Sequence, residues 1–485
     1  MVAPRLQASL ALERYTGLMD ISVKPIDLNG LLARLRAAHQ RQTPDYTQRI
    51  ADLKRLRAAY KARIEEFAIA MSADFGRRSR HESLLTDGMT VVNEIDYLVR
   101  HLRGWMRPKR AAADGLFFPA RTEVRYQPLG VVGVIAPWNY PVNLALMPLA
   151  VAIAAGNHVM LKPSEHTPRT SQLLKDLIAE VFPQDRATTV LGGPDVAAAF
   201  AALPLDHLFF TGSTAVGRKV MAAAAQNLTP VTLELGGKSP VIIAPDYPVA
   251  TAADRIAAGK FLNAGQTCIA PDYVLLPRTM IPAFAEEMKK YISRRYANLA
   301  ANPDYSSIVN DAQYSRLKSY LDQAHAAGAQ IVELAAGDAG KRILPPTLVL
   351  DAREDLALMQ DEIFGPILPL VAIDSVDAAI DYINARPRPL ALYHFDQNKA
   401  RTERVLERTI AGGVSVNETV MHIAQNHLPF GGVGPSGMGH YHGREGFLTF
   451  SKQKPVLYQA RWSSMKLMRP PYRGVADFLV KFLTR

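Results

Sequence analysis

Between residues 130 and 235 the chain repeats one pattern, in which a short apolar run is followed by a turn and then by a helix-like segment. The apolar runs are residues 131–135, 158–161, 188–191, 207–210 and 231–235. Repeated alternation of strand and helix predicts a parallel sheet that is covered by helices on both faces. Ligands of such sheets bind at the carboxyl ends of the strands, so a site is expected in the loops that follow these runs.

A second region of mixed strands and helices begins near residue 236. Its helix-like segments are 254–263 and 282–296, and its strand-like runs are 273–276, 347–350 and 367–371. A chain of 485 residues is too long for one core, so two or three structural units are expected. A boundary at Gly236-Gly237 leaves Glu234 and Cys268 in different units, with a cleft between them where chemistry can take place.

The remaining segments are helical or ribbon-like. Residues 30–106 have helical periodicity, and residues 115–127 alternate in their second half, as a two-stranded ribbon does. Residues 1–20 contain no continuous apolar stretch, so a signal peptide is not expected. Residues 475–483 have apolar side chains at helical spacing, which predicts a short amphipathic helix. We expect this helix to pack on the protein or on a partner subunit, and peripheral membrane contact is the less favoured alternative.

The charge balance is basic, but no nucleic-acid motif accompanies it. The formal net charge is +11, yet the basic residues form only short clusters, without an RRM, zinc-finger or basic-zipper pattern. The field therefore favours anionic cofactors or surfaces, and no nucleic-acid partner is predicted. His440 and His442 have no third ligand at metal-binding spacing, so no metal is predicted.

Cys268 is the only cysteine of the chain. It can form no intramolecular disulfide, and one cysteine in a long chain fits a reducing compartment, which predicts a cytoplasmic protein. Free cysteine is usually buried and inert, so the alternatives are an apolar core residue and a nucleophile. Gly265 and Gln266 follow a helix-like run and indicate a turn with free backbone N–H groups. Such groups lower a thiol pKa and can hold an oxyanion.

Two polar residues at predicted strand ends suit catalysis. Asn139 lies in a loop that two prolines restrict, where a fixed amide can donate to an oxyanion. Glu234 interrupts an apolar strand, and burial would raise its pKa towards that of a general base at neutral pH. The alternatives are an asparagine that satisfies a turn and a glutamate that pairs with Lys238.

Other strand ends offer a place for a dinucleotide. Residues 212–217 turn from strand into helix, and the free N–H groups of a helix start can bind phosphate, although a plain turn is equally compatible. Glu165 follows an earlier strand that we expect to end beside Gly212, where a carboxylate can bond both ribose hydroxyls of an adenosine. Glu165 therefore favours NAD over NADP, unless it only forms a solvated ion pair with Lys162.

These residues lie in motifs that resemble the aldehyde dehydrogenase superfamily, in family order and over residues 30–460. The motifs are Pro137-Trp138-Asn139, Lys162-Pro163-Ser164-Glu165, Phe210-Thr211-Gly212-Ser213, Glu234-Leu235-Gly236-Gly237-Lys238, Gly265-Gln266-Thr267-Cys268 and Glu362-Ile363-Phe364-Gly365-Pro366. Segments 137–141, 270–273 and 439–443 are similar to the class 3 branch. Within that branch, segments 74–82, 382–393 and 439–446 resemble the bacterial coniferyl aldehyde dehydrogenases.

The resemblance implies the aldehyde dehydrogenase fold, which belongs to the α/β class, and a homodimer. The implied parts are a Rossmann-like parallel-sheet NAD-binding domain (1–109 and 129–235), an α/β catalytic domain (236–435), a β-ribbon oligomerisation element (110–128 and 453–463) and a C-terminal amphipathic tail (464–485). The resemblance makes Cys268 the nucleophile, Glu234 the base, and Asn139 with the Cys268 N–H the oxyanion hole. The implied cofactor-binding residues are Pro137, Trp138, Lys162, Ser164, Glu165, Gly212, Ser213, Thr214, Ala215, Val216, Gly217, Leu235, Glu362 and Phe364.

The reaction that the resemblance implies is oxidation of an aldehyde to a carboxylic acid, with NAD as cofactor and NADP as the alternative. The substrate it favours is coniferyl aldehyde, which would give ferulate through a thiohemiacetal and a thioester on Cys268. Tyr140, beside Asn139, either lines an aromatic-tolerant pocket or is packing. The alternatives are a broad medium-chain, fatty or other aromatic aldehyde dehydrogenase and, in another class, a catalytically silent NAD-binding scaffold.

Overall fold

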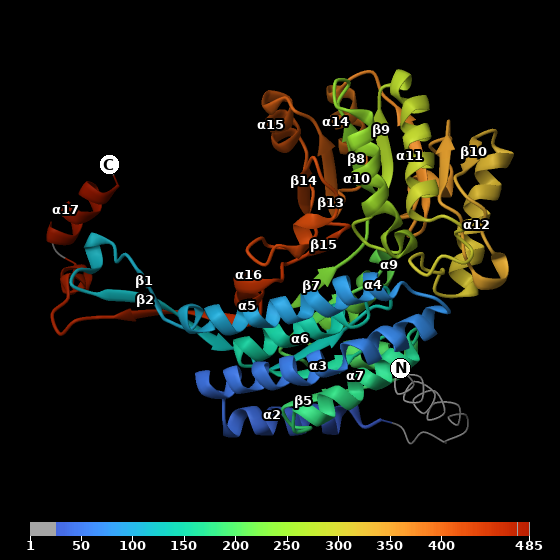
Figure 1. Cartoon of the computed structure of the whole chain (residues 1–485). Coiled ribbons are helices and arrows are strands. Elements are labelled where there is room, and N and C mark those ends of the chain that lie inside the picture. Colours follow the sequence, from blue (N-terminus) through green and yellow to red (C-terminus); the bar gives the residue numbers. More distant parts are fainter. Residues whose placement is uncertain (1–25, 473, 485) are drawn as a thin grey trace.

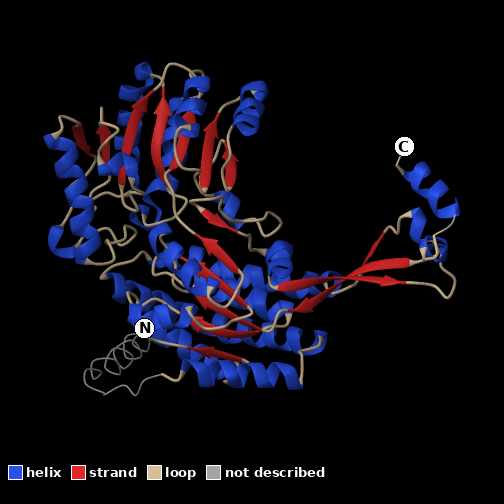
Figure 2. Cartoon of the chain, turned by 180° about the vertical axis from the view of Figure 1, so that it is seen from behind, coloured by secondary structure: helices blue, strands red, loops and turns tan. Residues whose placement is uncertain are grey.

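The structure is a computed structural model that describes residues 26–472 and 474–484. The prediction on a signal peptide concerns residues 1–20, which lie outside the described residues. Three sheets of six, seven and three strands organise the chain (Figure 1). Each large sheet and the helices that cover it form one α/β unit, and the two units lie next to each other. The small sheet projects from the body as a ribbon (Figure 2). The predicted fold class is confirmed.

The six-stranded sheet has the order β15-β7-β6-β3-β4-β5. Its parallel strands are β3 (Val131–Ile135), β4 (His158–Lys162), β5 (Ala187–Thr189), β6 (His207–Thr211) and β7 (Val231–Glu234), and β15 (Gly437–Met438) joins β7 antiparallel. The chain starts in the middle at β3 and proceeds first to one side and then to the other, so the crevice for a ligand lies beside β3. The expectation that β4 ends directly beside β6 is wrong, because β3 lies between them.

Helices cover both faces of this sheet because its strands are apolar on both sides. Leucines of α2 pack on one face with α8 and α9, whereas α6 lies on the other face and is covered by α3, α5 and α7. Except for its first residue, every residue of α6 is buried. The helices up to residue 225 are α2 (Leu28–Arg41), α3 (Tyr46–Phe75), α4 (Arg80–Ser83), η1 (Leu84–Met89), α5 (Thr90–Trp105), α6 (Asn143–Ala155), α7 (Pro168–Val181), α8 (Pro194–Ala201) and α9 (Thr214–Ala225).

The seven-stranded sheet has the order β10-β11-β12-β9-β8-β13-β14 and is parallel except for β10. Its strands are β8 (Ser239–Ile243), β9 (Pro271–Leu276), β10 (Gln330–Glu333), β11 (Thr347–Leu350), β12 (Ile367–Ala372), β13 (Ala391–Phe395) and β14 (Gly413–Val416). Its helices are α10 (Val249–Phe261), α11 (Ile281–Arg295), α12 (Asp311–Ala326), α13 (Ala357–Gln360), α14 (Val376–Asn384) and α15 (Lys399–Arg408). A further helix, α16 (Gly443–Thr449), belongs to the unit of the six-stranded sheet, where it packs on α6.

The projecting ribbon has three strands where the alternation within residues 115–127 predicted two, and the third overlaps the segment 453–463 that the resemblance implied for the ribbon. Strand β2 (Arg121–Pro128) pairs antiparallel with β1 (Lys109–Ala111) and along its whole length with β16 (Ser451–Tyr458). Residues Gly115–Phe117 form a 3-10 turn instead of a strand. The third strand comes from a segment more than 300 residues away, so local alternation could not reveal it.

The predicted C-terminal helix is α17 (Gly474–Leu483), at the far end of the ribbon and away from the body (Figures 1 and 2). Its apolar face is open, with Phe478 66% and Phe482 68% exposed, and of its residues only Ala476 is buried. The expectation that this helix packs on the body of its own chain is therefore wrong. In the described part of the chain, no helix is both long and apolar enough to cross a membrane.

Candidate active site

Cys268 lies in the turn between η3 (Leu262–Gly265) and β9, at the carboxyl side of α10. The turn requires glycine at position 265, where φ is +75° and a Cβ would lie 2.3 Å from the carbonyl oxygen of Gly365. Asn263 and Ala264 also have positive φ, of 50° and 51°, which is unusual outside glycine and concentrates at functional sites. Cys268 as a residue has intermediate exposure, while its thiol group is buried. The inert core residue was one alternative for Cys268, and the strained turn favours the nucleophile over it.

The buried amide of Gln266 braces this turn. Its Nε2 donates to the carbonyl oxygens of Asn263 at 3.0 Å and Ser307 at 3.1 Å, and its Oε1 accepts from the N–H of Val309 at 3.0 Å. All the polar atoms of the amide are satisfied by backbone groups, which fixes the side chain. The backbone two residues before Cys268 is therefore held in one conformation.

Asn139 reaches this turn from the loop after β3. Its Nδ2 donates to the carbonyl oxygen of Gln266 at 3.1 Å, and this bond orients an amide that has a second N–H for another acceptor. The hydroxyl of Tyr140 lies 2.6 Å from the Thr267 hydroxyl. The structure thus brings the predicted oxyanion donor to the turn that contains Cys268. Tyr140 itself is only 8% exposed, so little of its ring faces open space.

Glu234 ends β7 between two neighbouring chain segments. Its carbonyl oxygen accepts from Gly212, and the residue pairs with Gly437 of β15, which fixes the backbone. Its side chain is buried, and among the described residues neither carboxylate oxygen has a hydrogen-bond partner. Burial raises the pKa of Glu234 well above its ordinary value. An unpaired buried carboxylate is costly, so this group is available for a reaction.

The alternative partner of Glu234 binds elsewhere. Lys238 Nζ lies 2.7 Å from a carboxylate oxygen of Asp272 and also donates to the carbonyl oxygens of Leu358 and Asp361. The proposed ion pair between Glu234 and Lys238 is therefore wrong. Asp272 in turn accepts from the N–H of Ile363 at 3.2 Å, so it connects the strand after Cys268 with the loop of Glu362.

The thiol of Cys268 is harder to ionise than the sequence predicted. Burial raises its pKa above the ordinary value, and the carboxylates of Glu362 and Glu234 add to the shift. Hydrogen bonds from the N–H groups of Cys268 and Ile269 act in the opposite direction but are smaller effects. The turn was expected to lower this pKa, but burial and then the charges of Glu362 and Glu234 outweigh the N–H groups of the turn.

At the end of β4, Lys162 and Glu165 form a pair with 2.6 Å between Nζ and Oε2. The Lys162 side chain is 2% exposed and that of Glu165 is 32% exposed, so this is not the solvated surface pair of the alternative reading. Burial alone would raise the pKa of Glu165, but hydrogen bonds from Lys162 and the backbone override it and hold the pKa below its ordinary value. Ser164, in the same loop, accepts from the N–H of His166.

The start of α9 has the features that a phosphate requires. Ser213 caps the helix by accepting from the Val216 N–H, while Ala215 and Val216 are exposed. Gly217 must be small, because a Cβ there would lie 2.5 Å from Cδ2 of Leu235. The first N–H groups of any helix have no carbonyl partner within the helix, and such groups can bind a phosphate.

Glu362 and Phe364, which precede β12 of the seven-stranded sheet, contact residues that follow strands of the six-stranded sheet. The Glu362 carboxylate lies against Gly236, where a Cβ would meet its Oε2 at 1.8 Å. Burial and then the charge of Asp272 raise the pKa of Glu362 to about 8. Phe364 has a positive φ of 52°. Its ring packs edge-on against the ring of Trp138, with 5.3 Å between the ring centres. Trp138 follows Pro137 directly in the sequence. The predicted cofactor residues Glu362 and Phe364 therefore contact Gly236 and Trp138, which follow strands of the first sheet.

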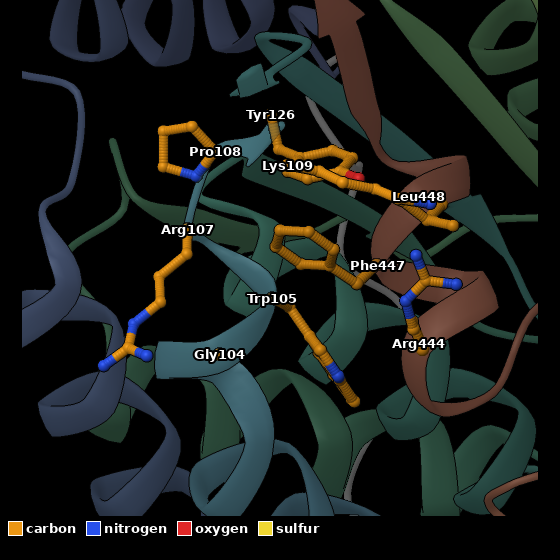
Figure 3. A pocket seen from close by; sticks show the side chains of 9 residues that line it. All are labelled: Gly104, Trp105, Arg107, Pro108, Lys109, Tyr126, Arg444, Phe447 and Leu448. Atoms are coloured by element: carbon orange, nitrogen blue, oxygen red, sulfur yellow. The ribbon is translucent and has the colours of Figure 1, made fainter. Parts of the chain in front are cut away.

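A cavity of about 250 Å³ lies elsewhere, at the base of the ribbon (Figure 3). Trp105, Tyr126 and Phe447 form its apolar wall, and Arg107 and Arg444 stand at its rim. None of the predicted site residues lines it. Within the described residues, no group of three side chains has the arrangement of a metal site.

Sequence reasoning missed the residues that hold the site together. Asp272 gives the clearest signal that could have found it, because it is an acid within an apolar strand, as Glu234 is. Arg78, in the loop after α3, and Asp87, in η1, contact the Asn139 loop from positions more than 50 residues away in sequence, and neither gives a local signal of this contact.

Comparison with known proteins agrees with this geometry. Residues 32–456 match the model of the Aldehyde dehydrogenase family. A probable coniferyl aldehyde dehydrogenase of Pseudomonas aeruginosa is 50% identical over 94% of this chain and 96% of its own, and a coniferyl aldehyde dehydrogenase of Pseudomonas sp. is 46% identical over 96% and 98%. The substrate-bound structure of Staphylococcus aureus AldH superposes with a TM-score of 0.90 at 38% identity, over 96% of this chain and 100% of that one. The chain belongs to the aldehyde dehydrogenase family.

Proposed function

We propose that this enzyme oxidises coniferyl aldehyde to the corresponding carboxylic acid, with NAD as its cofactor. The observation that carries the chemistry is the meeting of three groups at one turn: Cys268, the Asn139 amide and the unpaired carboxylate of Glu234. The substrate is inferred from the relatives at 46–50% identity that are named for it.

The reaction follows from these groups. The Cys268 thiolate adds to the aldehyde carbonyl, and the Asn139 amide with the Cys268 N–H holds the resulting oxyanion. NAD, when bound, supplies the hydride acceptor. Loss of the hydride leaves a thioester on Cys268, and Glu234 takes a proton from the water that hydrolyses it. A raised pKa suits Glu234 for this step, because a base is most effective when its pKa is near the working pH.

The cofactor assignment is supported by the contacts at the strand ends. Lys162 and Glu165 would hold the adenosine ribose, the start of α9 the pyrophosphate, and Glu362 with Phe364 the nicotinamide end. A carboxylate beside the ribose disfavours a 2′-phosphate, which supports NAD over NADP.

We also propose the domain limits of the chain, its assembly into a homodimer and its location in the cell. The domain limits are those given above, with 1–109 and 129–235 binding the cofactor and 236–435 carrying the nucleophile. The ribbon and helix α17 support a homodimer. The apolar face of α17 is exposed in the single chain, and such a face marks a site that a second subunit can cover. Contact of α17 with a membrane surface is the less favoured alternative. The single cysteine supports a cytoplasmic location.

A kcat/KM series with coniferaldehyde, benzaldehyde and decanal tests the substrate. We expect coniferaldehyde to have the highest kcat/KM with NAD. A wide preference for decanal would contradict the coniferyl assignment and favour a fatty-aldehyde enzyme, for which the exposed apolar helix α17 would be suited. Absence of NADH formation with all three aldehydes would favour the silent scaffold.

A further inference from the structure

A buried ion pair lies behind the loop that carries Asn139. Arg78 Nη2 is 2.9 Å from Asp87 Oδ2, and both side chains are fully buried. Arg78 follows α3, and Asp87 belongs to η1, a π-helical turn between α4 and α5. Such turns are uncommon and often occur at functional sites. Arg78 lies in segment 74–82, which carries part of the resemblance but no predicted site residue, and Asp87 lies outside the motifs.

The pair holds both ends of the Asn139 loop. Arg78 Nη1 donates to the carbonyl oxygen of Asn139 at 2.6 Å. The other oxygen of Asp87 accepts from the N–H groups of Val142 at 3.2 Å and Asn143 at 2.9 Å, where α6 begins. Asp87 therefore caps α6 from another helix, and one ion pair fixes the backbone on each side of Tyr140.

The pair is also linked to the nucleophile's turn. The guanidinium carbon of Arg78 lies 5.0 Å from the ring centres of both Phe75 and Tyr140. The hydroxyl of Tyr140 bonds that of Thr267, next to Cys268. A buried ion pair by itself is weak evidence for stability, because desolvation offsets its attraction. Its contacts here are instead concentrated on one catalytic loop.

We propose that Arg78 and Asp87 are positioning residues that set the direction of the Asn139 amide towards the oxyanion. The inference rests on the proposed role of Asn139. A donor stabilises an oxyanion only when it is aimed at the place where charge develops, and a misplacement of about 1 Å can cost about 100-fold in rate. Removal of Arg78 leaves the Asn139 carbonyl with Asn263 Nδ2, at 3.1 Å, as its remaining donor, and it leaves Asp87 as an uncompensated buried charge.

A double-mutant cycle on the holoenzyme tests this, with the rate of first-turnover NADH formation measured by stopped flow with coniferaldehyde. We expect Asn139→Ala to slow this rate about 100-fold or more, as loss of an oxyanion donor does. Arg78→Met should slow it about 10- to 100-fold. In the Asn139→Ala background, Arg78→Met should change it by less than about threefold, because its effect acts through the amide. Arg78→Lys, which keeps one donor, should restore part of the rate.

The matched control is Arg186→Met, which breaks a buried pair of the same length with Asp52, at the opposite edge of the sheet. It should lower the melting temperature and leave the first-turnover rate unchanged. If the effects of Arg78→Met and Asn139→Ala multiply, or if folded Arg78→Met reacts at the normal rate, the positioning role is wrong while the proposed function stands. If Asn139→Ala reacts at the normal rate, both the oxyanion assignment and the positioning role fail. Should Arg78→Met not fold, Arg78→Lys and Asp87→Asn enter the same cycle.

Discussion

Lys238 Nζ lies 2.7 Å from the carboxylate of Asp272 and does not pair with Glu234, which lies four residues before it at the end of β7. This pairing has two consequences. It leaves Glu234 without a counter-charge, so the pKa of Glu234 stays raised. It also ties β9, which follows Cys268, to the loop that carries Glu362.

Asp272→Asn should therefore both destabilise the enzyme and weaken its binding of NAD. Breaking a buried pair from one side costs about 3–5 kcal/mol, and Lys260 behind it also loses its nearest carboxylate. Chemical denaturation and titration with NAD measure the two effects. Glu287→Gln, which breaks an exposed pair of 2.8 Å with Lys290, should change stability by less than about 1 kcal/mol. Equal effects of the two variants would contradict this account.

Gly265→Ala should abolish activity and lower the yield of folded protein. The new Cβ would meet the backbone oxygen of Gly365 at 2.3 Å, at φ +75°. Gly328 has φ +89° but nothing within 4 Å of its Cβ position. Gly328→Ala should therefore cost only the backbone strain, about 1 kcal/mol, and keep the normal rate. Circular dichroism and steady-state assays distinguish the two, and an active Gly265→Ala enzyme would show that the turn is not constrained as described.

Alkylation of Cys268 by iodoacetamide, without cofactor, should be slow at pH 7 and rise with pH beyond 9. The reason is that burial and the carboxylates of Glu362 and Glu234 raise the thiol pKa. Glu234→Gln removes one of these charges, so it should speed alkylation at pH 8. A rate that levels off below pH 8 in the unmodified enzyme would contradict the raised pKa.

Glu94 should make the enzyme less stable as pH rises. Its side chain is fully buried, and burial raises its pKa to about 7. The folded protein therefore holds a proton that the unfolded chain loses near pH 4.5, so stability is highest below that pH and falls as pH rises through 7. The loss is on the order of 3 kcal/mol.

The variant Glu94→Gln keeps an acceptor for the N–H of Gly443 and cannot ionise. Its melting temperature should match that of the normal protein at pH 5 and exceed it at pH 8.5. As a control, changing the exposed Glu286 to Gln should give the same difference in melting temperature from the normal protein at both pH values. A constant difference between Glu94→Gln and the normal protein at both pH values would rule out the titration of Glu94.

The parallel sheet could be predicted from sequence because each of its strands is a continuous apolar run with a helix behind it. The strands β8, β10, β13 and β14 and the helices α12, α13, α14, α15 and α16 were not predicted. β13, for example, is a fully buried run of only five residues, and periodicity alone does not assign so short a run to a strand. The third ribbon strand, β16, depends on pairing with a distant segment. Local patterns do not record such pairing.

The candidate site divides in the same way. Asn139, Glu234 and Cys268 could be found because each is a polar residue where the surrounding pattern is apolar or tightly turned. Their surroundings could not be predicted, since Arg78, Asp87 and Asp272 act through contacts between separate elements. The raised thiol pKa could not be predicted either, because it comes first from burial and then from the carboxylates of Glu362 and Glu234, which lie 94 residues after Cys268 and 34 residues before it in the sequence.

The most direct test of the central claim is mass spectrometry of Glu234→Gln after brief mixing with NAD and coniferaldehyde. Without its base, the enzyme should form NADH in a single burst and then retain the acyl group. We predict a mass increase equal to one acyl group, located on the peptide that contains Cys268, and none in Cys268→Ala. Normal steady-state turnover by Glu234→Gln, or an acyl group on another residue, would contradict the account.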